Sequence, residues 1–139
     1  MLFLLSHFSN LLLDQLERYG ARKGAWAVVT GATDGIGKEF SYQLAKNGFN
    51  VLLVARNSQL LSEAAVDIGQ FVYAMHTSQL TFNNLGLESK YKVSTLTHLI
   101  DFSKSSDDAY DGLATTCGGL DIGVLGMFAY FVTNPPMLI

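Results

Sequence analysis

The residues of this chain best suited to chemistry lie in one glycine-rich turn. Glycines stand at 31, 35 and 37, after the apolar run 25–30 and before a helical pattern. Glycine adopts backbone angles that a Cβ forbids, and its missing side chain lets a phosphate reach the N–H groups at a helix start. The order strand, turn and helix therefore predicts a site for a nucleotide pyrophosphate, as in a dinucleotide-binding βαβ unit.

Two further polar residues follow predicted strands. The apolar run 50–55 is typical of a parallel strand covered on both faces, and Arg56 comes directly after it. An Arg there accommodates the 2′-phosphate of NADP, whereas a solvated Arg that opens the next helix is the alternative. Asp101 ends the predicted strand 95–101, and ligands of open α/β sheets bind at the carboxyl ends of strands. Asp101 is therefore a candidate for the adenine side of the cofactor.

Hydrophobic spacing predicts the elements that hold these residues. An apolar residue at every fourth position predicts a helix that follows the glycine turn and ends at Asn47. Ser58 is expected to cap a second helix that reaches about Ile68. A third helix over 107–117 and a fourth strand over 120–125 complete the order.

Segment 69–86 interrupts this order, because it has no clear period and many large apolar residues. A structureless loop of that length is uncommon inside a compact βαβ fold. The helix before it would run naturally into 87–93 if the segment were skipped, so the sequence predicts an insertion, with translated intron sequence as one source. His76 within it is expected to be incidental, and His98 is expected to lie on a sheet face without chemistry.

Composition limits the classes of function. The chain has 139 residues, of which 49% are hydrophobic and 15% charged, as expected for one compact domain. Its net charge of −3 provides no basic field for nucleic acid, so that class of partner is excluded. The single cysteine, Cys117, allows no internal disulfide and no metal cluster, and it is interpreted as a small filler in a helix. No metal is therefore expected, and a reducing, cytosol-facing location fits.

Both ends of the chain are apolar. Residues 1–17 begin with an apolar run that is shorter than the roughly 20 residues that cross a bilayer, and cationic residues follow closely. The segment is expected to be interfacial or part of a truncated membrane anchor, with a helix packed on the domain as the alternative. The divergent segment 126–139 leaves three interpretations open: a buried tail, a disordered tail and a sequence artefact.

Several blocks of sequence together resemble a known family. These blocks are 19–21, 24–32, 34–40, 51–57, 100–103 and 120–125. They are similar to the short-chain dehydrogenase/reductases and, more narrowly, to the very-long-chain 3-oxoacyl-CoA reductases, also called microsomal β-ketoacyl reductases. A related branch contains 17β-hydroxysteroid dehydrogenases. The resemblance covers 18–125, the predicted NADP-binding portion, apart from the insertion.

This resemblance implies an enzyme of the endoplasmic-reticulum membrane that faces the cytosol. It would use NADPH to reduce a 3-oxoacyl-CoA to the 3-hydroxyacyl-CoA, alongside the other enzymes of fatty-acid elongation. Arg56 would hold the 2′-phosphate and Asp101 the adenine. The remaining cofactor contacts would come from the glycine turn, namely Thr30, Gly31, Thr33, Asp34, Gly35, Ile36 and Gly37.

The departures from the family pattern are equally informative. The family carries Asn-Asn-x-Gly after its fourth strand, where this chain has Gly126-Met127-Phe128-Ala129. The family's catalytic Ser and Tyr-x-x-x-Lys lie further on than this sequence reaches, and the pair provides the general acid. Tyr42 and Lys46 have the right spacing but fall on the cofactor helix, and they are interpreted as an exposed pair.

The expectation is therefore a partial Rossmann fold of class α/β. It would have about four parallel strands with helices on both faces, truncated before the catalytic half. Such an amino-terminal fragment is expected to be catalytically incomplete and poorly soluble, because it exposes an apolar sheet edge. Two other functions stay open: a 17β-hydroxysteroid dehydrogenase-like ketone reductase, and a non-catalytic fragment that associates with a full-length reductase.

Overall fold

The described residues form one parallel sheet of four strands in the order β3-β2-β1-β4. The computed structural model describes residues 14–82, 93–104 and 106–129, with 73–82 described by their backbone alone. The strands are β1 (Trp26–Thr30), β2 (Asn50–Ala55), β3 (Thr95–Leu99) and β4 (Ile122–Met127). The α/β class and the number of strands are as predicted.

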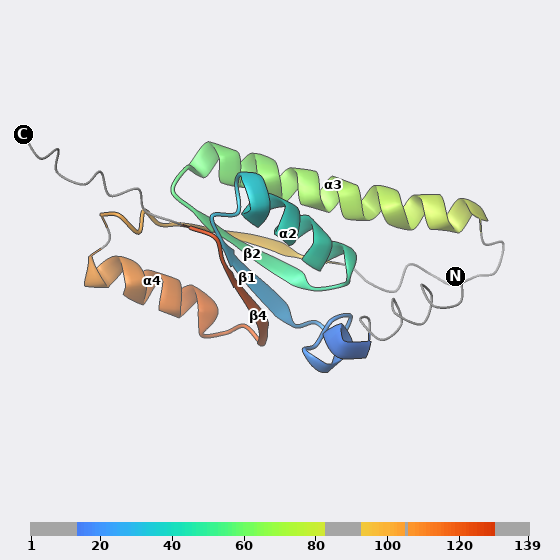
Figure 1. The fold of residues 1–139 in the computed structure, drawn as a ribbon, viewed down its shortest axis with the longest axis horizontal. Coiled ribbons are helices and arrows are strands. Elements are labelled where there is room, and N and C mark those ends of the chain that lie inside the picture. The colour runs from blue at the N-terminus through green and yellow to red at the C-terminus, as the bar shows by residue number, and fades with distance from the viewer. Residues whose placement is uncertain (1–13, 83–92, 105, 130–139) are drawn as a thin grey trace, which may run out of the picture.

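Helices cover both faces of the sheet. Figure 1 shows α2 (Gly35–Lys46) and α3 (Ser58–Phe82) on one face and α4 (Asp107–Cys117) on the other. This arrangement confirms the partial Rossmann architecture, since strands and helices alternate along the chain and every strand pair is parallel.

Two apolar layers separate the sheet from its helices. The larger layer lies between the sheet and α2 with α3, and it includes Val29, Phe49 and Leu53 at 0% exposure. The smaller layer lies towards α4 and is built around Leu52 and Val54. Because alternate residues of β2 face opposite layers, its residues 51–55 are all apolar and buried, as expected for a strand covered on both faces.

Helix α3 differs from the prediction at both of its ends. The predicted end near Ile68 is wrong, because the helix continues to Phe82. The buried positions of α3 continue beyond that point at helical spacing, so Val72 packs in the same layer as Ile68. The predicted cap at Ser58 is also wrong, since the side-chain oxygen of Asn57 accepts the N–H of Leu60 at 3.0 Å. The interpretation of 69–86 as an insertion stays a prediction, and 83–86 lie outside the described residues.

Two strand boundaries also move. β3 ends at Leu99 instead of 101, although the N–H of Ile100 still donates to the carbonyl of Ala55 at 3.0 Å. β4 begins two residues later than predicted and continues to Met127, so the predicted end at 125 is wrong. Gly126 and Met127 pair in register with Val29 and Thr30, and they belong to the sheet instead of a divergent tail. The rest of that tail, from 130 on, lies outside the described residues.

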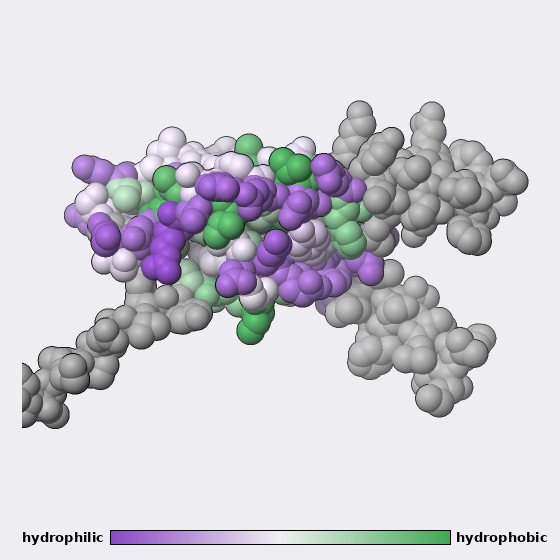
Figure 2. All heavy atoms as spheres, turned by 90° about the horizontal axis from the view of Figure 1, so that it is seen from above, coloured by the Kyte–Doolittle hydropathy of each residue, from purple (hydrophilic) through white to green (hydrophobic). Residues whose placement is uncertain are grey.

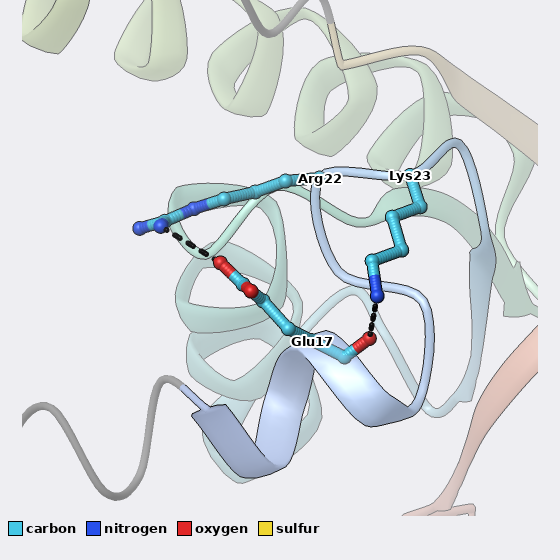
Figure 3. A network of polar contacts seen from close by, with 3 residues as sticks. All are labelled: Glu17, Arg22 and Lys23. Atoms are coloured by element: carbon cyan, nitrogen blue, oxygen red, sulfur yellow. Dashed lines mark hydrogen bonds and ion pairs between the residues drawn. The ribbon is translucent and has the colours of Figure 1, made fainter.

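A short helical segment leads into β1. Residues 14–18 are helical, and Glu17 forms a 3.4 Å ion pair with Arg22 while its carbonyl accepts from Lys23 Nζ at 3.0 Å (Figure 3). The N–H of Arg22 donates to the carbonyl of Gly48 at 2.9 Å, which ties this segment to the loop after α2. The predicted segment 1–17 lies mainly outside the described residues. Among the helices that are described, none is both long enough and apolar enough to cross a bilayer.

The outer strands leave apolar side chains exposed. On β4, Leu125 is 62% exposed and Met127 is 75% exposed, and on β3 Leu99 is 58% exposed. Seen from above, the surface is mostly hydrophilic or neutral, with several small apolar patches among the polar residues (Figure 2). The sheet is therefore well covered at its centre and open at both edges.

Gly69 provides a test of the extended helix. It lies inside α3 without a positive φ, and a Cβ placed there meets nothing within 4 Å. Gly69→Ala is therefore expected to raise the free energy of unfolding by about 0.5–1 kcal/mol, because glycine weakens a helix interior. Urea unfolding of both proteins measures the difference.

Gly24 is the matched control for this substitution. A Cβ there also meets nothing within 4 Å, but the φ of Gly24 is 91°. Gly24→Ala is expected to lower the stability by about 1 kcal/mol, because a left-handed backbone angle disfavours side chains. A Gly69→Ala protein that is also destabilised would contradict the helix at this position.

Candidate functional site

The glycine turn begins at the carboxyl end of β1. Thr30, the last residue of β1, is buried, and Gly31 has a φ of 66°. The N–H of Gly31 donates to the carbonyl of Val54 at 2.9 Å, which ties the turn to β2. Gly35 has a φ of 53°, an angle that residues with a Cβ rarely adopt. The backbone path itself therefore favours glycine at positions 31 and 35.

Gly37 serves a different purpose, which is the close packing of α2 on β1. A Cβ on Gly37 would collide with the carbonyl oxygen of Gly31. A Cβ on Gly31 would lie 2.8 Å from the backbone of Phe128. The turn therefore brings a helix N-terminus close to the end of a strand, beside Phe128, whose Cβ lies 3.2 Å from where a Cβ of Gly37 would stand. A nucleotide pyrophosphate fits such a cradle, because its oxygens can approach the backbone.

The first turn of α2 supplies the backbone donors. Asp34 is the N-cap, and its side chain accepts the N–H of Gly35 at 2.7 Å. The N–H groups of Ile36 and Gly37 have no helical carbonyl four residues earlier and point out of the helix end. Apart from the cap, Asp34, no acidic side chain lies within the first turn of α2, and the positive end of the helix dipole favours negative charge there. Thr33, half-buried, precedes these residues in the same turn.

Thr30 joins β1 to the chain that follows β4. Its hydroxyl oxygen accepts the N–H of Phe128 at 3.1 Å and that of Ala129 at 3.3 Å. β1 lies between β2 and β4, so this is the point of the sheet where the order of strands reverses. Ligands of open α/β sheets bind at such a point, outside the carboxyl ends of the strands. The contact of Thr30 with a cofactor stays a prediction. Its observed hydrogen bonds connect the end of β1 to the segment after β4.

The structure brings Arg56 and Asp101 together in a shallow, open hollow of about 270 Å³. This β2–β3 hollow lies at the carboxyl ends of β2 and β3 and at the start of α4. It is adjacent to the glycine turn, because the N–H of Gly31 donates to the carbonyl of Val54, two residues before Arg56. Its lining includes Arg56, Leu99, Ile100, Asp101, Lys104 and Ser106. The predicted adenine and 2′-phosphate residues therefore share one cavity, as a common site requires.

The carboxylate of Asp101 is held in its ionised form. Its Oδ1 accepts the hydroxyl of Ser103 at 2.6 Å and the backbone N–H of Ser103 at 3.1 Å. These hydrogen bonds lower the pKa of Asp101 below its ordinary value, and the charges of Lys104 and Arg56 lower it further. Asp101 is therefore an ionised hydrogen-bond acceptor that lines the hollow.

The prediction that Tyr42 and Lys46 form an exposed pair is wrong for Tyr42, whereas Lys46 is exposed. Tyr42 is half-buried against Phe71 of α3, with ring centroids 5.3 Å apart. Burial raises the pKa of Tyr42, and so do the charge of Asp67 and the hydrogen bond that its carboxylate accepts from the phenol. A tyrosine that protonates a carbonyl needs a lowered pKa, so Tyr42 is unsuited to that role.

Sequence reasoning missed a second pair with the same spacing. Tyr19 and Lys23 also stand four residues apart, but they precede β1 and so lie at the amino end of the sheet. The Nζ of Lys23 donates to the carbonyl of Glu17, as Figure 3 shows, and Tyr19 is 58% exposed. Neither Tyr-x-x-x-Lys pair therefore lies beside the glycine turn.

The remaining candidate side chains have structural contacts. The Nδ1 of His98 lies 3.0 Å from the hydroxyl of Thr116 in α4, so His98 links β3 to that helix. Cys117 is half-buried and packs with the layer between the sheet and α4. Within the described ranges, no three His, Cys, Asp or Glu side chains form a group that could hold a metal ion.

The comparison with protein families matches residues 25–99 to a model described as short chain dehydrogenase. The chain is 50% identical over 128 residues to the very-long-chain 3-oxoacyl-CoA reductase of Laccaria bicolor, and 48% identical over 128 residues to that of Coprinopsis cinerea. Both alignments cover 86% of this chain and 32% of the relative. The chain therefore spans about a third of the length of these curated relatives.

Solved structures show the same fold. An L-sorbose reductase from Gluconobacter frateurii, complexed with NADPH and L-sorbose, matches with a TM-score of 0.54 and 27% identity, covering 82% of this chain and 36% of the other. A 7β-hydroxysteroid dehydrogenase matches with a TM-score of 0.51 and 28% identity, covering 70% of this chain and 30% of the other. Relatives of this fold therefore include proteins that bind a nicotinamide cofactor.

The close packing at Gly37 leads to a testable expectation. Gly37→Ala should lower the free energy of unfolding by about 1–3 kcal/mol, because the new methyl group forces α2 away from β1. Gly112→Ala in α4 is the matched control, since a Cβ there lies 3.8 Å from its nearest neighbour, His98 Cε1. The control should be neutral or slightly stabilising in thermal unfolding. Equal effects of the two substitutions would contradict the close approach.

The environment of Tyr42 predicts a dependence of stability on alkaline pH. Its folded pKa lies above the ordinary value of 10.0, so its contribution is present below that pH and is lost as the pH rises through the folded pKa. Tyr42→Phe should therefore flatten the alkaline loss of stability. In wild type minus Tyr42→Phe difference spectra, the ultraviolet tyrosinate signal should appear above pH 10.0, and Asp67→Asn should shift it down. Titration below that value would overturn the assignment.

Proposed function

Because the chain belongs to the short chain dehydrogenase family, we propose that it carries the NADPH-binding part of a very-long-chain 3-oxoacyl-CoA reductase. NADPH, when bound, supplies the hydride that reduces a carbonyl to an alcohol. The substrate would be a 3-oxoacyl-CoA and the product the 3-hydroxyacyl-CoA. The activity of the whole reductase belongs to this proposal, since the chain spans about a third of its relatives.

One observation carries the choice of cofactor. Arg56, directly after β2, and Asp101, just after β3, line one hollow beside the glycine turn. In this arrangement the N–H groups at the start of α2 bind the pyrophosphate, Arg56 binds the 2′-phosphate and Asp101 accepts a hydrogen bond from the adenine. An acidic residue in place of Arg56 would favour the ribose hydroxyl of NAD instead.

The identity to reductases named for very long chains supports the choice of substrate. The proposal includes a role in fatty-acid elongation, with elongation enzymes as partners, and a cytosol-facing position at the endoplasmic-reticulum membrane. A steroid ketone is the second candidate substrate, supported by the structural match to a 7β-hydroxysteroid dehydrogenase. A third candidate is a non-catalytic chain that associates with a full-length reductase, and the exposed apolar residues of β4 favour it. Co-purification with such a reductase would support that candidate.

Replacing Arg56 tests the cofactor assignment. Arg56→Ala should weaken the binding of NADPH to the purified chain by about tenfold and leave NADH binding unchanged, because only NADPH carries the 2′-phosphate. Fluorescence titration with each cofactor measures both affinities. Arg18→Ala is the control, since Arg18 precedes β1 and lies outside the hollow. Equal binding of NADPH and NADH to the wild-type chain would contradict the proposal.

The same preparation tests whether these residues turn over a substrate. Both Tyr-x-x-x-Lys pairs lie away from the glycine turn, so this chain by itself should bind NADPH without oxidising it when a 3-oxoacyl-CoA is added. Loss of NADPH absorbance that depends on the acyl-CoA would show that a proton donor is present after all.

A further inference from the structure

Lys104 is a charged residue that lines the β2–β3 hollow, and the proposed function assigns no role to it. It follows β3 by five positions, its side chain is exposed, and it lines the hollow together with Arg56 and Asp101. The backbone N–H of Lys104 donates to the carbonyl of Asp101 at 3.0 Å, so a tight turn fixes where the side chain starts. The turn therefore fixes the backbone of Lys104 beside the hollow.

We propose that Lys104 is a second specificity-determining residue, which binds the 2′-phosphate of NADP(H) together with Arg56. This inference rests on the proposed function, because it needs a cofactor that carries that phosphate. The ligand group is a phosphate monoester on the ribose, and the two cations would approach it from the ends of two neighbouring strands.

The balance of charges in the hollow favours binding of the 2′-phosphate by two cations instead of one. Among the residues that line it, Arg56 and Lys104 are positive and Asp101 is negative. With Arg56 alone, the carboxylate would already offset the single positive charge before a ligand entered. A phosphate monoester adds a charge of about −1.5 to −2 at neutral pH. Lys104 therefore leaves the hollow with a net positive charge that can attract this group.

Ser103 contributes more than either cation to the environment of the Asp101 carboxylate. Its Oδ1 already accepts two hydrogen bonds from Ser103, one from the hydroxyl and one from the backbone. The pKa of Asp101 is lowered first by these bonds and only then by the charges of Lys104 and Arg56. Lys104 is thus close enough to act electrostatically on the carboxylate, which also accepts two hydrogen bonds from Ser103. A flexible ammonium group of this kind suits a phosphate, which accepts hydrogen bonds from several directions.

Two small probes separate this role from a structural one. Adenosine 2′,5′-bisphosphate carries the 2′-phosphate, whereas adenosine 5′-monophosphate lacks it, and calorimetric titration of the full chain measures the affinity for each. Lys104→Ala should weaken the binding of the bisphosphate by about fivefold and leave the affinity for the monophosphate unchanged. Lys104→Arg should retain the bisphosphate affinity, and added salt should reduce the difference between wild type and Lys104→Ala.

Lys46→Ala is the matched control, because it also removes one positive charge, from the end of α2 that is farther from the glycine turn. It should change neither affinity. Equal weakening of both probes by Lys104→Ala, or no weakening of either, would overturn the role of Lys104. A wild-type chain that binds the bisphosphate no better than the monophosphate would overturn the proposed cofactor as well, so the two failures can be told apart.

Discussion

The close approach of α2 to β1 is the constraint on which the candidate site depends. Gly37 lies against the carbonyl of Gly31, where any side chain would collide. This contact sets the end of the helix directly at the carboxyl end of the strand, so the N–H groups of the first turn face the crevice. The position of the β2–β3 hollow follows, because Gly31 is bonded to Val54 at the end of β2. The absence of a side chain at Gly37 and the bond from Gly31 to Val54 together set the two ends of the proposed cofactor site.

The two ends of this site recognise negative charge by different means. At the glycine turn the donors are backbone groups, which keep their geometry because the helix holds them. At the hollow the groups are the charged side chains of Arg56, Lys104 and Asp101, and those of Arg56 and Lys104 are exposed to solvent. Backbone donors suit the pyrophosphate that all nicotinamide dinucleotides share, and side chains suit the ribose position at which they differ. Selectivity can thus change without any change in the fold.

The sequence predicted those elements that a local rule specifies. The apolar run of β2 and the interval of α4 agree with the structure at both bounds, because a buried strand and a flanked amphipathic helix leave strong patterns. The end of α3 was missed, since a glycine at 69 suggests a break although the buried spacing continues to Val72. β4 was placed early, because its pairing with β1 is set by the sheet and not by its own residues.

The candidate site was predictable to a similar degree. The glycine turn, Arg56 and Asp101 follow from their places at strand ends, which topology brings to one edge. The environment of Tyr42 could not be inferred, because it depends on Asp67 and Phe71 from another helix. The hydroxyl of Thr30 likewise bonds to Phe128, which stands 98 residues further along the chain. The pairing of β4 with β1 brings these two distant parts of the chain together, so the contact depends on that pairing. An intact crevice therefore indicates that the first and last strands of the described sheet are joined in register.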